Sequence, residues 1–103
     1  MKEYYVYITT NPKKTTLYTG MTNDLQFRLK THYLNRGQPE TFAGKYFCYN
    51  LVYYDTFNNP DDAIRAEKYI KGKSRKWKLD LIKSFNPSFA FLNKIVCGSW
   101  PPK

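Results

Sequence analysis

Two runs with β-strand character, separated by a short turn, most constrain what this chain can fold into. The run Glu3–Thr10 (EYYVYITT) is rich in aromatic and β-branched residues, and its odd-numbered and even-numbered residues would occupy opposite faces. The Asn-Pro pair of Asn11–Lys14 is typical of a turn, after which Thr15–Met21 (TTLYTGM) reads as a returning strand. We therefore predict an antiparallel hairpin. Gly20 is expected to end its second strand, where a Cβ would restrict the backbone.

A helix is expected directly after this hairpin, over Asp24–Leu34. Leu25 and Leu29 lie four residues apart and would face the core, while Arg28 and His32 share the same spacing one step around the helix. Three suitable N-cap residues stand at its start, namely Thr22, Asn23 and Asp24.

The rest of the chain predicts one more strand and two more helices. Tyr46–Phe57 is the longest β-like run and is expected to be a central strand covered on both faces, after a loop at Asn35–Lys45. Asn58–Gly72 opens with Asn-Pro and an acidic turn, which suits a helix start. Ser74 is expected to cap a helix that ends near residue 85 and buries a stripe around Leu81. The remaining residues are predicted to be irregular, with a short helical turn around residues 89–93.

These elements give the order β-β-α-β-α-α, which favours a small α/β or α+β domain built on a three-stranded sheet. A chain of 103 residues is long enough for one hydrophobic core and too short for two. We expect a single domain over residues 1–103, with a core of about 3–95 and an irregular tail at 96–103.

The charge balance predicts an anionic partner. Seventeen Lys and Arg residues against eight Asp and Glu residues leave a net charge of +9, which attracts polyanions. Nucleic acid is the first candidate and an anionic membrane surface the second. No apolar run approaches the roughly 18 residues needed to span a bilayer, and the first ten residues lack the apolar segment of a secretory signal. Cys48 and Cys97 lack C-x-x-C spacing, so we expect reduced thiols in a cytoplasmic protein and no cysteine metal site.

Glu67 is the acidic residue with the most informative position. It falls within the apolar arc that Ala63, Ile64 and Ile70 form on their helix, and a half-buried carboxylate is costly unless it is paired or binds a cation. Two interpretations stay open: a salt bridge to a nearby Lys or Arg, or a lone metal ligand. Mg²⁺ is often held by one or two carboxylates plus water and substrate phosphate.

Asp61 and Asp62 do not extend this site, because their place in the first turn of the helix is explained by the helix dipole. The sequence therefore lacks the carboxylate cluster of a two-metal nuclease, and phosphodiester chemistry would use one ion. Arg28 and His32 suit an anionic substrate, since Arg binds phosphate oxygens and His relays protons near neutral pH. The basic run Lys68–Lys78, with interleaved aromatic residues, is either a phosphate-binding surface or a solvated helix pair.

Taken together, the motifs YVY (residues 5–7), YTG (18–20), RLKTH (28–32) and AEK (66–68) resemble those of the GIY-YIG nuclease superfamily, and in particular its small stand-alone bacterial members. The resemblance spans about Glu3 to Ile95. The first triplet lacks the glycine and isoleucine of the family motif, and Thr19 replaces the isoleucine of the second. Both keep the tyrosine. The resemblance implies a three-stranded antiparallel sheet flanked by helices.

By this resemblance, Tyr7 and Tyr18 take the positions of the two motif tyrosines, one as general base and the other orienting the water. Arg28 would steady the scissile phosphate, and Glu67 would bind the metal ion. His32 matches a position where many members carry a histidine or tyrosine. The family's asparagine has two candidates here, Asn86 first and Asn93 second. Further nucleic-acid contacts are expected from Gly20, Lys45, Lys71, Lys73, Arg75, Lys76 and Asn86.

The implied function is a DNA endonuclease that uses one Mg²⁺ or Mn²⁺ ion, in DNA repair or recombination. DNA, branched or single-stranded, is the expected partner, while a repair intermediate, a flap, RNA and a substrate of no preferred structure also stay open. No second DNA-binding domain is present, so targeting is either absent or supplied by a protein partner. The alternative is a nucleic-acid-binding module without turnover on the same fold. A basic adaptor for a membrane or an acidic protein is the third hypothesis, and no helix has the free apolar face that a membrane contact needs.

Overall fold

The computed structural model describes residues 3–102, and the first two strands form the predicted hairpin. β1 (Tyr4–Thr10) pairs antiparallel with β2 (Leu17–Thr22) in a register that sets Tyr7 opposite Gly20. The side chain of Asn11 closes the turn, because its Oδ1 accepts from two backbone N–H groups just before β2. The Asn-Pro signal therefore marks the turn correctly.

β3 (Asn50–Phe57) pairs antiparallel with the free side of β1, so the sheet order is β2-β1-β3. The prediction of a central third strand beginning at Tyr46 is wrong in both respects. The strand begins later because the backbone N–H groups of residues 46–48 bond to carbonyls of α2 (Phe42–Lys45), with Phe47 at φ +59°. β1 is central because β3, parallel to β2, joins the opposite side of the hairpin after a crossover.

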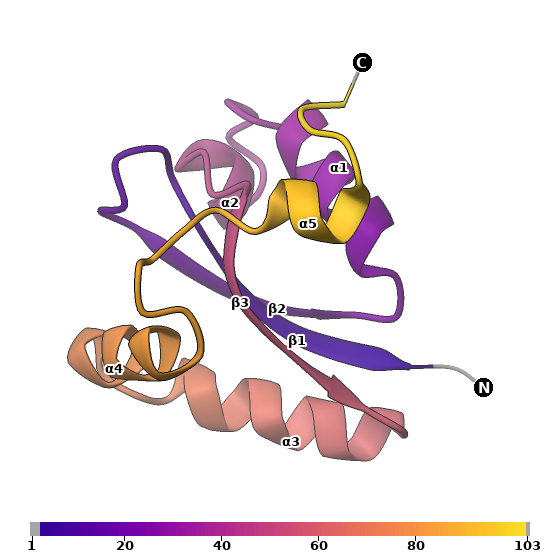
Figure 1. Cartoon of the computed structure of the whole chain (residues 1–103), viewed down its shortest axis with the longest axis vertical. Helices are drawn as coiled ribbons and strands as arrows, with labels where there is room; N and C mark the ends of the chain where they lie inside the picture. The colour runs from indigo at the N-terminus through magenta and orange to yellow at the C-terminus, as the bar shows by residue number, and fades with distance from the viewer. Residues whose placement is uncertain (1–2, 103) are drawn as a thin grey trace.

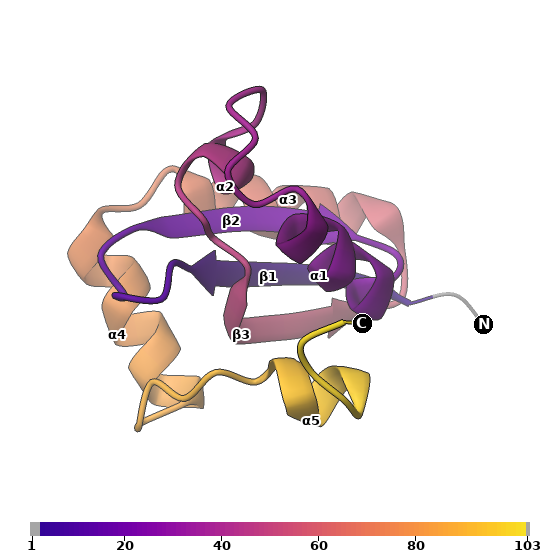
Figure 2. The same cartoon turned by 90° about the horizontal axis from the view of Figure 1, so that it is seen from above.

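Helices cover both faces of the three-stranded sheet (Figure 1). α1 (Leu25–Leu34), α2 and α5 (Asn93–Cys97) lie on one side, and α3 (Pro60–Lys71) and α4 (Arg75–Phe85) lie on the other. Figure 2 shows α1 crossing over the strands with α3 behind them. The fold is thus a mixed α/β arrangement with flanking helices, as predicted, with two additional short helices.

The predicted starts of α1 and α4 are confirmed, because the expected side chain caps each helix. Asp24 accepts from the backbone N–H of Phe27 at the start of α1, and Ser74 accepts from Trp77 at the start of α4. The two short helices differ from prediction, since α2 lies in the expected loop. α5 begins where the expected turn around residues 89–93 ends, and it extends two residues into the tail expected to be irregular.

The core forms two clusters, one on each face of the sheet. The alternation of β1 separates them, as predicted, with Val6 and Ile8 on the α3–α4 side and Tyr7 on the α1 side. Leu25 and Leu29 of α1 are buried against Tyr7. Tyr7 therefore lies under α1, the helix that carries Arg28 and His32.

Among residues 3–102, no helix has the length and apolar character needed to cross a membrane. Cys48 is buried and Cys97 half-buried, and both are free thiols.

Candidate active site

A hydrogen bond between Tyr7 and His32 forms the centre of the site. The Tyr7 Oη and His32 Nε2 atoms lie 2.8 Å apart, joining the middle of β1 to the last turn of α1. Burial, with a smaller contribution from Arg28, lowers the pKa of His32 to about 4. The imidazole is therefore neutral at pH 7, and we assign Oη as the donor and Nε2 as the acceptor.

Tyr18 completes a compact group of rings that we call the tyrosine–histidine cluster (Tyr7, Tyr18 and His32). The Tyr18 ring meets His32 edge-on at 5.4 Å between centroids, and its centroid lies 6.3 Å from that of Tyr7. The hairpin register explains this proximity, because Tyr18 lies two residues from the position opposite Tyr7. The three consecutive elements β1, β2 and α1 thus meet at one point.

Gly20 provides the space into which the Tyr7 ring extends. A Cβ at Gly20 would lie 2.5 Å from Tyr7 Oη and 2.6 Å from Tyr7 Cζ, which no real contact allows. The prediction that Gly20 ends its strand through backbone freedom is wrong, because β2 continues to Thr22 and Gly20 has no positive φ. The position excludes a side chain so that Tyr7 can reach His32.

The Tyr7 phenol keeps its proton at neutral pH in the protein described here. Burial is the largest cause that raises the pKa of Tyr7, followed by Tyr18 and then the negative charge of Glu67, while Arg28 acts in the opposite direction. These effects also show that charges from α1 and α3 both act on this hydroxyl. A protonated phenol beside a neutral imidazole is arranged to donate its proton to that imidazole.

Arg28 lies on the exposed side of α1, one turn before His32. It takes part in none of the three ion pairs found among residues 3–102. Its charge acts on both Tyr7 and His32, so an anion bound by Arg28 would lie beside the cluster.

Glu67 is half-buried on α3, as predicted, with 21% of its side chain exposed. Lys71 forms an ion pair with it at 3.3 Å, four residues along the helix. Within residues 3–102 no group of three or more His, Cys, Asp or Glu side chains could hold a metal ion. A divalent ion at Glu67 would therefore take most of its ligands from water and substrate oxygens. One carboxylate is enough for Mg²⁺ bound in this way.

The two asparagine candidates lie outside the cluster and are buried. The amide of Asn86 donates to the carbonyls of Val52 and Ala90. The side chain of Asn93 accepts from the backbone N–H of Leu51 and donates to the carbonyl of Tyr49. In the structure both side chains bond to the backbone around β3.

The predicted basic contacts are dispersed. Lys71 lies beside Glu67, whereas Lys76 pairs with Asp80 at 3.2 Å. Lys73 stacks over the rings of Tyr69 and Trp77. Arg75 lines a small pocket together with Phe42, and Lys45 lies over the ring of Tyr46.

Phe42 is a site residue that sequence reasoning missed. Its ring stacks on Tyr18 at 6.2 Å, with the ring planes 24° apart, although it belongs to a segment expected to be a loop. A helix of four residues is too short to show a helical pattern of apolar residues. The only sequence signal at this position is the aromatic residue itself.

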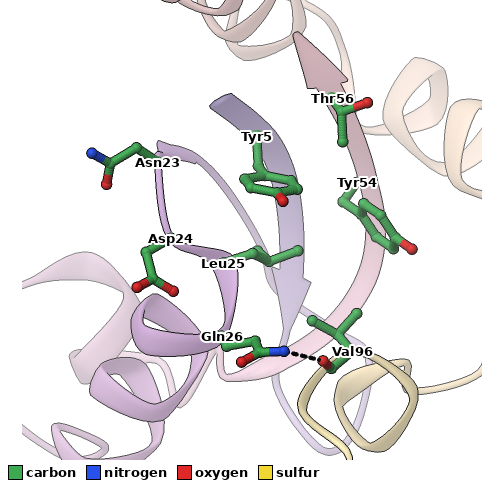
Figure 3. Close-up of a pocket in the computed structure, with 8 residues that line it drawn as sticks. All are labelled: Tyr5, Asn23, Asp24, Leu25, Gln26, Tyr54, Thr56 and Val96. Carbon is green, nitrogen blue, oxygen red and sulfur yellow. Dashed lines mark hydrogen bonds between the residues drawn. The ribbon is translucent and has the colours of Figure 1, made fainter. Parts of the chain in front are cut away.

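A larger pocket of about 410 Å³ lies beside the start of α1 (Figure 3). Tyr5, Leu25 and Tyr54 form its apolar walls, and the side chain of Gln26 donates to the carbonyl of Val96 at one end. None of the predicted site residues lines it. Its size therefore does not mark the predicted chemistry.

Comparison with known proteins finds a matching family and similar sequences. Residues 3–80 match the GIY-YIG catalytic domain family. A UPF0213 protein of Clostridium perfringens is 41% identical over 80 residues, which cover 78% of this chain and 83% of that protein. A UPF0213 protein of Staphylococcus haemolyticus is 37% identical over 82 residues, covering 80% and 96%. The names of these relatives specify no activity.

A solved structure supports the fold. The solution NMR structure of a UPF0213 protein from Bacillus halodurans is 27% identical and superposes with a TM-score of 0.55. The match covers 90% of this chain and 96% of that chain.

Proposed function

This chain belongs to the GIY-YIG catalytic domain family, a family of nucleases, and we propose that it is a divalent-metal-dependent endonuclease that hydrolyses phosphodiester bonds in DNA. The net charge of +9 supports a polyanionic substrate. The observation that carries the proposal is the hydrogen bond between Tyr7 and His32. The charges of Arg28 and Glu67 both influence the pKa of the Tyr7 hydroxyl in this bond.

The Tyr7–His32 pair would move the proton of the attacking water. Tyr7 Oη accepts a proton from the water while its own hydroxyl proton passes to Nε2 of His32, so the phenol need not ionise at its raised pKa. The water oxygen forms a bond to phosphorus as the bond from phosphorus to the departing sugar oxygen breaks. That oxygen takes a proton from solvent, and His32 later returns its proton to solvent. Tyr18 orients the water.

Arg28 and the ion held by Glu67 would stabilise the negative charge on the phosphate. Arg28 binds the non-bridging oxygens, to which its planar guanidinium is suited. Glu67 holds the divalent ion, which when bound supplies positive charge that stabilises the transition state. Lys71 is half-exposed, so its ion pair with Glu67 is weak and a bound divalent ion could replace Lys71 as the partner of Glu67.

The first experiment compares the wild-type protein with Glu67→Gln on labelled single-stranded, double-stranded and branched DNA. Mg²⁺ or Mn²⁺ is supplied, with EDTA as the metal-free control. We expect metal-dependent cutting by the wild-type protein and at least roughly a hundredfold slower cutting by the variant, since the ion contributes several kcal/mol. Asp61→Asn removes one exposed negative charge from the same helix and should cut normally.

Two results would contradict the proposal in different ways. Glu67→Gln that cuts at the wild-type rate would remove Glu67 from the mechanism. A wild-type protein that binds DNA but cuts none of the substrates with either ion would favour the non-catalytic binding module instead.

A further inference from the structure

A second, smaller pocket of about 230 Å³ adjoins the tyrosine–histidine cluster. Phe42 connects the two, because it lines this pocket and stacks on Tyr18. The pocket draws on the end of the hairpin turn, on α2 and on α4. Its lining residues are Thr15, Thr16, Leu17, Phe42, Arg75 and Lys78.

The polar side of this pocket is suited to an anion. Arg75 and Lys78 lie three residues apart on α4, hence on one side of the helix. Neither takes part in an ion pair among residues 3–102. The guanidinium of Arg75 has only a long contact, 3.5 Å, with a backbone carbonyl. Two cations and neighbouring threonine hydroxyls in a concave site are the groups that bind a phosphate.

The apolar side of the pocket is an exposed aromatic ring. Phe42 is 49% exposed and belongs to neither core cluster, so packing of the core does not explain it. The ring of Tyr46, the residue directly after α2, packs against the ring of Phe42 at 4.7 Å between centroids. Exposed aromatic rings beside basic groups are the usual platforms on which unpaired bases stack.

The larger pocket of Figure 3 has the opposite charge character. Asp24 lines it, and the negative charges of Glu3 and Asp24 both act on the Tyr5 hydroxyl at its wall. A phosphate would be repelled there. A phosphate is therefore favoured in the pocket beside Phe42 over the pocket beside Tyr5.

We propose that the pocket formed by Phe42, Arg75 and Lys78 is a subsite for one unpaired nucleotide next to the scissile phosphate, with its base on Phe42 and its phosphate on Arg75 and Lys78. The subsite rests on the proposed function for its relation to the cleaved bond. Its nucleotide is unpaired because neighbouring bases in a duplex already cover both faces of a base. The pocket, at about 230 Å³, is also smaller than the roughly 300–1,000 Å³ of typical ligand sites, so it can contact only a small part of a polynucleotide.

The test measures binding of a fluorescent oligothymidylate, and of a fully paired duplex, by anisotropy in EDTA so that no cutting intervenes. Phe42→Leu should weaken binding of the single strand on the order of tenfold and leave duplex binding unchanged. Phe42→Trp should restore it. Phe85→Leu is the matched control, since Phe85 is 45% exposed and lies against β3 at the other edge of the sheet.

A second pair of variants tests the phosphate side without altering the ring. Arg75→Ala/Lys78→Ala should weaken single-strand binding more than Lys83→Ala/Lys94→Ala, which removes the same charge from exposed positions outside the pocket. Equal losses in the two double variants, or normal single-strand binding by Phe42→Leu, would overturn the subsite.

Binding without metal separates this proposal from the nuclease itself. Pocket-dependent binding in a protein that never cuts DNA would keep the site as a nucleotide-binding site and reject only its relation to catalysis. Metal-dependent cutting together with binding that is insensitive to Phe42 would keep the nuclease and reject the subsite.

Discussion

At the level of single residues, burial fixes which proton each member of the cluster carries. Tyr7 is almost completely buried, which favours the neutral phenol, and His32 is buried enough to favour the neutral imidazole. A neutral pair joined by one hydrogen bond can shift a proton from oxygen to nitrogen without first binding one from solvent. Both groups are therefore neutral at pH 7, which is the starting state that the proposed proton transfer requires.

The lowered pKa of His32 predicts how stability depends on pH. Between about 6.5, the pKa in the unfolded chain, and about 4, the unfolded state binds a proton that the folded state does not, so stability falls as the pH falls through this window. The loss attributable to His32 should reach at most about 3 kcal/mol. Urea unfolding at several pH values, compared with His32→Gln, measures it. A variant with the same pH dependence as the wild-type protein would contradict this prediction.

Gly20 predicts a steric effect on the same pair. In Gly20→Ala the new Cβ would displace the buried Tyr7 ring and break its hydrogen bond to His32, costing about 1–3 kcal/mol of stability. DNA cutting should fall with it. Gly72→Ala is the control, because its Cβ would meet nothing closer than 3.5 Å. Thermal unfolding and DNA-cutting rates are measured for both variants. A Gly20→Ala protein as stable and active as Gly72→Ala would refute the steric argument.

At the level of elements, sequence identified those whose local signals agree with their tertiary context. Three helices, α1, α3 and α4, follow the prediction closely, because a polar N-cap residue precedes each amphipathic run. These N-cap residues are Asp24, Asn59 and Ser74. The position of β3 in the sheet differs from the prediction. Its apolar residues contact both clusters, as those of a central strand would, although it lies at an edge under α4 and α5.

The shortest elements could not be predicted because tertiary contacts fix them. The start of α5 is set by Asn93, whose side chain bonds to the backbone on either side of Asn50. Nothing in the local sequence reveals that partner. The site shows the same division: motifs indicated Tyr7, Tyr18 and His32 as candidates, but their hydrogen bond and the contribution of Phe42 depend on how the elements pack.

Asn93 provides a prediction for this anchoring. Asn93→Ala leaves a buried N–H of Leu51 and a carbonyl of Tyr49 without their partner, which should cost roughly 1–3 kcal/mol. Chemical denaturation measures the loss, with Asn58→Ala as an exposed control expected to change stability little. Native-like stability of Asn93→Ala would show that α5 is held by its apolar contacts instead.

At the scale of the whole molecule, the proposed site draws on helices from both faces of the sheet. Tyr7, Tyr18 and His32 come from β1, β2 and α1 on one face, while Glu67 comes from α3 on the other. The motif resemblance is confirmed by the family match and by the fold of the solved relative. The chain carries a net charge of +9, and within residues 3–102 ion pairs engage three Lys and Arg side chains.

This surplus predicts that DNA binding depends steeply on salt, through the counterions that each phosphate contact releases. For a single-stranded oligonucleotide in EDTA, a plot of log affinity against log salt concentration should fall by about 0.7 for every phosphate contact. Arg28→Gln removes one such contact, so its slope should be shallower by about that amount. Arg65→Gln is the matched control, because Arg65 already pairs with Asp62 and should leave the slope unchanged. Equal slopes in the wild-type protein and Arg28→Gln would mean that Arg28 does not bind phosphate, and would remove it from the proposed mechanism.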